Sequence, residues 1–343
     1  MKLYCGMDLH SNNVVTRVID TNDKTLYKKK LPCELDIILN ALQPYKNSIV
    51  GIAIESTFNW YWLVDGLKEQ GYEIHLVNTA AVKQYEGLKH TDDDSDAFWL
   101  AHLLSLGILP TGYIYPKEQR AVRDLARKRS QLVQNRTTQI LSLQTLHIRN
   151  TGRPLSCNAI KKLTLEDIKK QFTDTNIILA MTSNLVIYEA LKQQIKIVEN
   201  AIENQIKLDP RYQNLMSIDG VGKILALTIM LETGDISRFE SVGNYASYCR
   251  LVGSTKLSNG KRKGKGNSKN GNKYLSWAYV EAANFCIRYN EHAKRYYQKK
   301  SAKTKSAKTK SVVALKALAH KLARASYYVM RDNVEFDSRK LFC

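Results

Sequence analysis

The sequence predicts an α/β domain followed by an all-helical remainder, and three observations lead to this prediction. Short runs rich in β-branched residues alternate with helix-length segments over roughly the first hundred residues. Two long stretches, 117–150 and 176–208, then carry apolar residues every three or four positions, as amphipathic helices do. Apolar helix-like segments continue to the end of the chain. At 343 residues, the chain is long enough for two or more domains.

The first part of the chain contains a series of segments with strand character. Residues 3–9, 13–20 and 25–32 are separated by turn-forming residues and predict an antiparallel meander. Residues 48–55 form a continuous apolar run, typical of a central strand that is covered on both faces. Another strand is expected at 73–78, and helix-like segments lie at 34–45, 58–71 and from 92 onward. This order favours an RNase H-like fold over a Rossmann fold, because no Gly-rich phosphate loop follows any strand.

The helical remainder is predicted to form two regions, so that the chain divides into residues 1–110, 111–208 and 209–343. The apolar seams of the two long helices leave two arrangements open, an antiparallel hairpin within one chain or a dimer interface. In the last region, the segment SIDGVGKILALTI resembles a helix-hairpin-helix. Gly220 and Gly222 allow a tight turn there, and the backbone N–H groups of the helix beginning near Lys223 can meet a DNA phosphate. The alternative is two packed helices joined by a glycine turn.

The charge of the chain points to a polyanionic partner. Lys and Arg number 52 against 32 Asp and Glu, which gives a formal net charge of +20. Nucleic acid is the commonest partner of such a surface, and an anionic membrane surface is the alternative. Six cysteines without CxxC spacing argue against a disulfide framework or a zinc site and indicate a reducing compartment. Because no run approaches the ~20 apolar residues of a membrane span and no signal peptide is evident, we expect a soluble cytoplasmic protein.

Acidic residues cluster at a few places in the first part of this basic chain. Asp8 ends the apolar run LYCGMD, Glu55 ends the run IVGIAIE, and the spacing of Asp93 and Asp96 places both on one face of a helix. The strands that end at Asp8 and Glu55 are expected to be neighbours in the sheet. Crowded carboxylates favour protonation or a bound cation, and a ligand set of oxygens alone selects Mg²⁺ or Mn²⁺. We therefore expect these four acids to bind metal; helix capping or turn formation is the alternative for each.

Residues 253–273 are rich in Gly, Asn and basic residues, and Leu257 is their one large apolar residue. This composition predicts a flexible basic loop that contacts phosphate backbones. Ser258 directly precedes the basic run, where a phosphodiester would be held, although solvated surface is the alternative for it as for Ser254 and Ser268. A second lysine-rich segment repeats SAKTK over 301–310 and is either a solvated linker or another nucleic-acid contact. Besides Gly220, Gly222 and Lys223, the expected nucleic-acid contacts are Lys256, Lys261, Arg262, Lys263, Lys265, Lys269 and Lys273.

Together these motifs resemble the transposases of the insertion-sequence 110 family, relatives of the Piv DNA invertases. The resemblance covers almost the whole chain. Asp8, Glu55, Asp93 and Asp96, the last two within DDSDA, match the DEDD motif of the family, with Asp92 and Asp94 as alternatives to Asp93. The nucleophilic serine of the family corresponds to Ser258 in this chain, with Ser254 as the alternative. Where the family often has Gly after Glu-x-Thr, this chain has Phe58. The C-terminal match runs through SIDGVGKILALTIMLETGD, FESVGNYASYCRLVGSTKLSNG and NSKNGNKYLSWAY.

The resemblance implies both a fold and an activity. The fold would be a RuvC-like DEDD domain, a coiled-coil segment and a C-terminal transposase domain. The activity would be Mg²⁺-dependent DNA recombination through a phosphoserine intermediate, guided by a bridge RNA that pairs with target and donor DNA. Two homodimers would form a tetramer, in which each active site combines the carboxylates of one protomer with the serine of another. A RuvC-like nuclease or Holliday-junction resolvase that uses water, and a non-catalytic nucleic-acid scaffold, are the alternatives.

Overall fold

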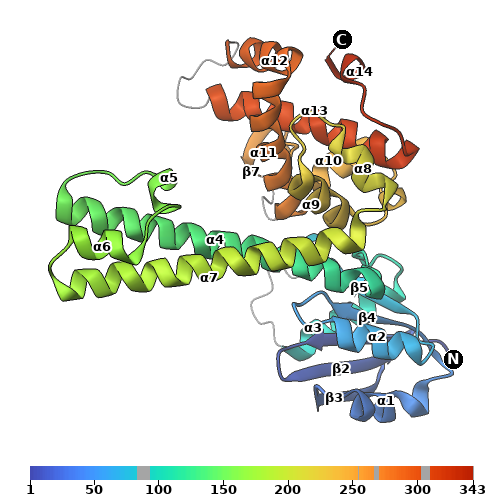
Figure 1. Cartoon of the computed structure of the whole chain (residues 1–343). Helices are drawn as coiled ribbons and strands as arrows, with labels where there is room; N and C mark the ends of the chain where they lie inside the picture. The colour runs from blue at the N-terminus through green and yellow to red at the C-terminus, as the bar shows by residue number, and fades with distance from the viewer. Residues whose placement is uncertain (83–92, 254, 266–269, 303–309, 343) are drawn as a thin grey trace. The chain divides into compact units, whose positions relative to one another are not determined.

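The structure, a computed structural model, describes all residues except 83–92, 254, 266–269, 303–309 and 343 (Figure 1). Of a few further residues, among them 93–94, 255–258 and 262–265, only the backbone is described. The chain forms two compact units, Met1–Lys117 and Glu118–Cys343. An α/β unit and a helical remainder are thereby confirmed. The RNase H-like assignment stays a prediction, as does the division of the second unit at residue 208.

The first unit is built on one mixed sheet with the strand order β3-β2-β1-β4-β5. The first three strands form the expected antiparallel meander, whereas β1 runs parallel to β4, and β4 parallel to β5. The strands are β1 (Leu3–Leu9), β2 (Asn13–Asp20), β3 (Thr25–Pro32), β4 (Ile49–Glu55) and β5 (Ile74–Val77). The helical elements are α1 (Leu35–Leu42), η1 (Gln43–Tyr45), α2 (Tyr61–Glu69), η2 (Thr79–Ala81) and α3 (Asp93–Ser105).

The two faces of this sheet are covered by different helices. Cys5 and Met7 of β1 belong to the core that includes Ile38 of α1 and Leu63 of α2. A smaller core on the other face joins Ala53 of β4 to α3, through residues such as Leu100. Successive side chains of a strand point to opposite faces, so Asp8 and Glu55 belong to the α3 face of the sheet.

The second unit begins with two long antiparallel helices, α4 (Lys117–Thr151) and α7 (Thr175–Ile206), shown in green and yellow-green in Figure 1. Their seam closes within one chain: Asn184 Nδ2 donates to Ser142 Oγ at 3.0 Å, and Arg129 pairs with Glu199 at 2.6 Å. The intramolecular hairpin, one of the two arrangements that the sequence left open, is therefore present, and the dimer interface stays a prediction. The short helices α5 (Cys157–Ile160) and α6 (Leu165–Gln171) connect the two long ones.

The rest of the second unit packs around α9, whose residues from Leu225 to Thr233 are all buried. A helix that is buried on every side is typical of a core surrounded by other helices. The elements of this part are α8 (Pro210–Met216), α9 (Lys223–Thr233), η3 (Ile236–Arg238), α10 (Val242–Tyr248), β6 (Thr255–Ser258), β7 (Lys261–Lys265), α11 (Lys273–Tyr289), α12 (Glu291–Ala302), α13 (Lys310–Asp332) and α14 (Ser338–Phe342). Across the described ranges, the structure contains no helix long and apolar enough to cross a membrane.

The expected flexible basic loop is in part a β-hairpin, and this prediction was wrong for residues 255–265. Strands β6 and β7 pair antiparallel, with Ser258 opposite Lys261. Asn259 and Gly260 connect them with positive φ angles of 50° and 71°. A two-residue Asn-Gly connection of this kind matches the twist of the strands on either side of it. The SAKTK repeat, in contrast, lies mostly outside the described residues.

Candidate functional site

The candidate catalytic site lies where two parallel strands end side by side. Met7 of β1 is paired with Ile54 of β4, so the next residues, Asp8 and Glu55, come together at the carboxyl edge of the sheet. Asp8 is only 3% exposed, and Glu55 is partly buried. The strand register thus brings together two carboxylates that are far apart in the sequence.

The environment of Glu55 makes its carboxyl group unusually weak as an acid. Burial, a hydrogen bond with Asp8 and the negative charges of Asp8 and Asp96 together raise the pKa of Glu55 to about 8. Glu55 therefore keeps its proton near neutral pH. A pKa shifted by burial and by like charges is a recurrent property of functional sites, although structural charge networks show it too.

A glycine of β1 brings the third acid to the site. A Cβ atom at Gly6 would lie 1.9 Å from the backbone oxygen of Ala97 and 2.8 Å from the nitrogen of Ala101. Helix α3 therefore packs with its backbone directly on β1, which is possible only because Gly6 has no side chain. Asp96, the residue before Ala97, is held by this contact close enough for its charge to act on Glu55.

Of the four predicted carboxylates, the structure pairs Asp8 with Glu55 and places Asp96 near enough for its charge to act on Glu55. Helix α3 begins at Asp93, as the sequence indicated, but the side chain of Asp93 lies outside the described residues, as does that of Asp94. Asp92 lies outside the described ranges altogether. Which acid beside Asp96 acts as the last ligand stays a prediction.

Three further residues at this edge were not singled out from the sequence. His10 Nε2 lies 3.0 Å from Asp8 Oδ2. Asn59 donates to the backbone oxygen of His10 at 2.9 Å, and Thr57 donates to Asn59 Oδ1 at 2.9 Å, so the loop after β4 is tied to the end of β1. The only sequence signal was their proximity, since each lies within four residues of Asp8 or Glu55. Beside them, Phe58 is 85% exposed.

The residues at this edge suit a divalent cation in their chemistry. The ligand atoms are carboxylate oxygens, the type that Mg²⁺ and Mn²⁺ prefer. The negative charges of Asp8 and Asp96 help to raise the pKa of Glu55, and a cation at this edge would compensate them. In the part of the chain that the structure describes, no group of three acidic, His or Cys side chains is close enough to hold an ion by itself. Asp8 and Glu55 would therefore form the core of a site that further oxygens complete.

The candidate serine lies in the second unit, at the end of β6. Its hairpin is anchored at the base: Asn272 N–H donates to the Tyr248 carbonyl at 2.6 Å, and Arg250 Nε donates to the Gly271 carbonyl at 2.9 Å. Lys261 and Lys273 are exposed. For Lys256, Ser258, Arg262, Lys263 and Lys265, the structure describes the backbone alone, and Ser254, Ser268 and Lys269 lie outside the described residues.

The predicted glycine turn joins α8 to α9, and its two glycines differ. Gly220 has a φ of +88°, and a Cβ there would lie 2.4 Å from the Ala282 oxygen of α11. Packing alone therefore requires Gly220. Gly222 caps the N-terminus of α9 and has open space around it, which leaves room for a phosphate. Lys223, the first residue of α9, forms a short ion pair with Glu203 of α7.

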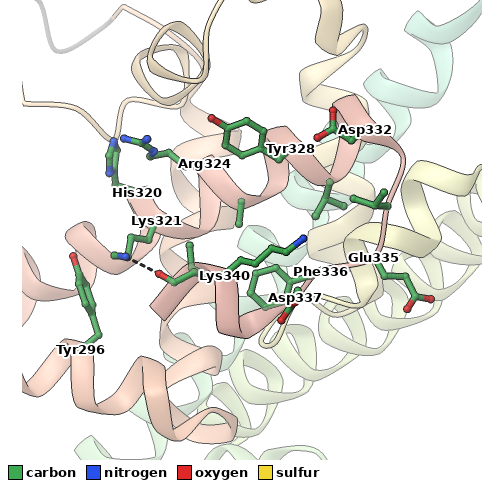
Figure 2. A pocket seen from close by; sticks show the side chains of 14 residues that line it. Tyr296, His320, Lys321, Arg324, Tyr328, Asp332, Glu335, Phe336, Asp337 and Lys340 are labelled. Atoms are coloured by element: carbon green, nitrogen blue, oxygen red, sulfur yellow. Dashed lines mark hydrogen bonds between the residues drawn. The ribbon is translucent and has the colours of Figure 1, made fainter. Parts of the chain in front are cut away.

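A separate cavity lies between α13 and the C-terminal segment (Figure 2). Lys321 of α13 donates to the Leu341 carbonyl at 2.7 Å and holds that segment in place. Burial and the nearby cations lower the pKa of His320. The cavity is lined by Lys321, Arg324 and Lys340 but also by Asp332, Glu335 and Asp337, so its charges nearly balance and give no preference for a polyanion.

Comparison with known proteins agrees with this picture. Residues 5–147 match a family model for DEDD transposases of the IS110 type, and residues 212–298 match one described as Transposase IS116/IS110/IS902 family. The chain is 22% identical to the transposase for insertion sequence element IS1328 of Yersinia enterocolitica, over 96% of this chain and 97% of that one. It is 24% identical to a probable family 20 transposase of Pseudomonas aeruginosa, over 69% and 71% of the two chains. Asp8, Glu55 and Asp96 lie within the first matched range, and the chain belongs to the IS110 family of transposases.

Proposed function

We propose that this transposase cuts and rejoins DNA strands through a phosphoserine intermediate that depends on Mg²⁺ or Mn²⁺. The observation that carries the proposal is the pairing of Asp8 with Glu55 at one edge of the sheet, with the charge of Asp96 acting on Glu55, in a chain of net charge +20. These acids raise one another's energy without a cation. A cation and a phosphodiester would together relieve that repulsion.

The carboxylates have the role of ligands. Asp8 and Glu55, with Asp96 and Asp93, would hold the cation, which when bound neutralises the phosphate oxygens and the charge that develops on them. Glu55 must lose its proton for this, so the raised pKa makes it the proton-releasing member of the set. Burial of Asp8 keeps water away from its carboxylate and strengthens its electrostatic interactions.

Ser258 has the role of nucleophile. Its Oγ forms a bond to phosphorus as the bond from phosphorus to the 3′-oxygen breaks, and its proton passes through a carboxylate to that leaving oxygen. A 3′-hydroxyl of the other duplex then attacks the phosphoserine, and the serine hydroxyl is restored. Phosphodiester bonds are exchanged one for one, so no energy source is required.

Guidance by a bridge RNA is proposed from the resemblance to the family. In this scheme, base pairing with the RNA recognises the DNA sequence, and the protein recognises the shape and the backbone of the duplex. The charge of the chain and the basic hairpin β6–β7 support backbone contacts of this kind. The DNA next to the gene would then encode a structured RNA with loops complementary to the insertion junction.

A composite active site is proposed on the same basis, and mixing experiments test it. Asp8→Asn and Ser258→Ala variants are each expected to be inactive. If the carboxylates and the serine of one site come from different protomers, a mixture of the two variants regains part of the strand exchange. A mixture as inactive as either variant contradicts the composite site without affecting the residue roles.

The covalent adduct distinguishes this function from its rivals. With Mn²⁺ and a cognate DNA junction, we expect a protein–DNA adduct that survives denaturation in the parent and in Ser254→Ala, but not in Ser258→Ala. Metal-dependent nicking without an adduct would instead identify a nuclease or resolvase that uses water. Strong salt-dependent binding without any cleavage would identify a non-catalytic scaffold.

A further inference from the structure

A groove between α4 and α11 combines cations, the exposed ring of Trp277, the partly buried ring of Tyr274 and amide side chains. On α4, Asp124, Lys128, Gln131 and Gln134 follow one another at helical spacing, so they share one face. On α11, Lys273 and Trp277 are one turn apart and form the facing wall together with Tyr274. All of these residues belong to the second unit, and none has been assigned a role except Lys273.

The floor of the groove is held by a buried ionic network. Glu232 of α9 is 3% exposed and accepts two hydrogen bonds from Arg127, at 2.6 and 2.8 Å. Its Oε2 also accepts from Asn272 Nδ2 at 2.7 Å, and Asn272 caps the N-terminus of α11 through its Oδ1. The network therefore fixes α4 and the first turn of α11 to the same buried carboxylate. A groove with both walls fixed in this way is preorganised for a ligand.

The charges that remain for a ligand are positive. Arg127 and Arg129 are paired with Glu232 and Glu199, so their charges are largely compensated. Lys128 bonds only to the amide oxygen of Gln131 at 3.0 Å, and the ammonium of Lys273 lies 5.2 Å from the centre of the Tyr274 ring. Neither lysine has an acidic partner within the described ranges. Among the described residues that line the groove, Asp124 is the one acid.

The aromatic rings supply a surface for a planar ligand. Trp277 is 42% exposed, a large fraction for an indole that has apolar helices behind it. The ring of Tyr274 lies under the Arg127 guanidinium at 4.9 Å and is thereby held in place. An exposed indole beside fixed cations stacks a nucleic-acid base, while the lysines attract its phosphate.

We propose that this groove binds unpaired nucleotides of a nucleic-acid single strand, with one base stacked on Trp277 and a neighbouring phosphate between Lys128 and Lys273. A duplex fits less well, because its bases are stacked on one another and present only edges and backbone. The amides of Gln131 and Gln134 can donate and accept hydrogen bonds at a base edge. The inference rests on the proposed function in that the partner is nucleic acid, but it requires neither Ser258 nor the carboxylates as catalysts.

Fluorescence of Trp277 in the full chain tests the proposal. The other three tryptophans, Trp60, Trp62 and Trp99, all belong to the first unit. Using Ser258→Ala protein to prevent cleavage, we would titrate oligothymidylate and oligouridylate in separate arms. Both are expected to quench the fluorescence, with the quenching lost in a Trp277→Phe background. The arm that binds more tightly identifies DNA or RNA as the source of the strand.

Affinity gives a second readout with matched controls. Trp277→Ala should weaken single-strand binding about tenfold, whereas Tyr328→Ala, which removes a similarly exposed ring on α13, should not. Lys128→Ala and Lys273→Ala should each lower, by about 1, the steepness with which the logarithm of the binding constant falls with the logarithm of salt concentration. Lys161, whose ammonium also donates to an amide oxygen, provides the control, since Lys161→Ala should leave this steepness unchanged.

The outcomes separate this inference from the proposed function. Unchanged affinity in Trp277→Ala without Trp277-dependent quenching, or equal quenching by a duplex, overturns the groove proposal. Formation of the Ser258 adduct is measured separately on parent protein. Trp277-dependent binding without an adduct would contradict the serine chemistry alone, and an adduct without such binding would contradict the groove alone.

Discussion

Charges are arranged in opposite ways at the edge of the sheet and in the α4–α11 groove. At the sheet edge, strand register pairs Asp8 with Glu55, and the contact of α3 with Gly6 brings the charge of Asp96 near them, so ionisation of Glu55 is opposed by charges of its own sign. In the groove, the buried Glu232 is matched by the guanidinium of Arg127 and the amide of Asn272. The first arrangement raises the energy of the metal-free protein, whereas the second satisfies a buried charge.

This difference indicates how a ligand-binding site can be distinguished from a structural charge network. When the protein itself supplies the hydrogen-bond partners of a buried charge, as it does for Glu232, no ligand is needed to account for that charge. Like charges that the backbone forces together have no such explanation and point to a missing ligand of opposite sign. The following predictions test whether the sheet edge is indeed costly without a cation, in order of decreasing expected effect.

Asp8→Asn is expected to have opposite effects on activity and stability. Strand cleavage should fall by about a hundredfold or more, because a ligand and its charge are lost. The metal-free protein should become more stable at neutral pH, by up to about 1 kcal/mol after solvent screening, because a charge that opposes ionisation of Glu55 is removed. Cleavage assays and urea unfolding measure the two effects.

A matched control for Asp8→Asn is Asp36→Asn, which alters an exposed acid in the first turn of α1. It should leave cleavage unchanged and should not stabilise the protein, since an acid at a helix N-terminus is favourable. If Asp8→Asn destabilised the metal-free protein and kept its cleavage activity, the sheet edge would be a structural network like that of Glu232.

Gly6→Ala is expected to separate the third acid from the other two. The added methyl group would overlap the Ala97 backbone, so α3 must move, at a cost of about 2–3 kcal/mol. Cleavage should fall further than the loss of folded protein explains. Gly112→Ala serves as control, because its Cβ would meet nothing closer than 3.5 Å. Equal unfolding midpoints for the two variants would show that α3 does not depend on Gly6.

The glycines of the α8–α9 turn should divide between folding and binding. Gly220→Ala should destabilise the second unit by about 3 kcal/mol, through its positive φ and its overlap with α11. Gly222→Ala should cost only about 0.5 kcal/mol but weaken duplex binding at low salt, if a phosphate occupies the N-terminus of α9. Unfolding by denaturant and salt-dependent binding assays distinguish the two; unaltered binding in Gly222→Ala would remove this turn from the DNA interface.

Metal binding should depend on pH through Glu55. Because its pKa is raised from 4.5 to about 8, Glu55 favours the folded metal-free state most below its ordinary pKa, and this contribution is lost as the pH rises through about 8. A cation must displace the proton, so Mg²⁺ affinity should fall by up to about tenfold per pH unit below that value. Calorimetry should detect proton release near pH 7 in the parent but much less in Glu55→Gln. Equal proton release by the parent and by Glu55→Gln would show that the proton comes from a group other than Glu55.

Much of the candidate catalytic edge could be predicted from the sequence, because hydrophobic runs show where strands end. Asp8 and Glu55 each follow such a run, and neighbouring parallel strands end at the same edge. The hairpin at Ser258 was missed although Asn259-Gly260 is a hairpin signal, since the basic composition around it suggested a loop. His10 and Asn59 could not be ranked above other polar residues, because their role depends on a loop conformation that no periodic pattern records.

By itself, the sequence determined the charge, the extents of most strands and helices, and which acids end apolar runs, because these follow from residue type and local periodicity. The tertiary structure decided which surfaces meet. It closed the seam of α4 on α7 of the same chain, allowed α3 to lie against Gly6, and paired Arg127 with Glu232 across 105 positions. Such contacts depend on how closely the backbones of distant segments approach and on how well their surfaces fit, and neither can be predicted from residue type alone.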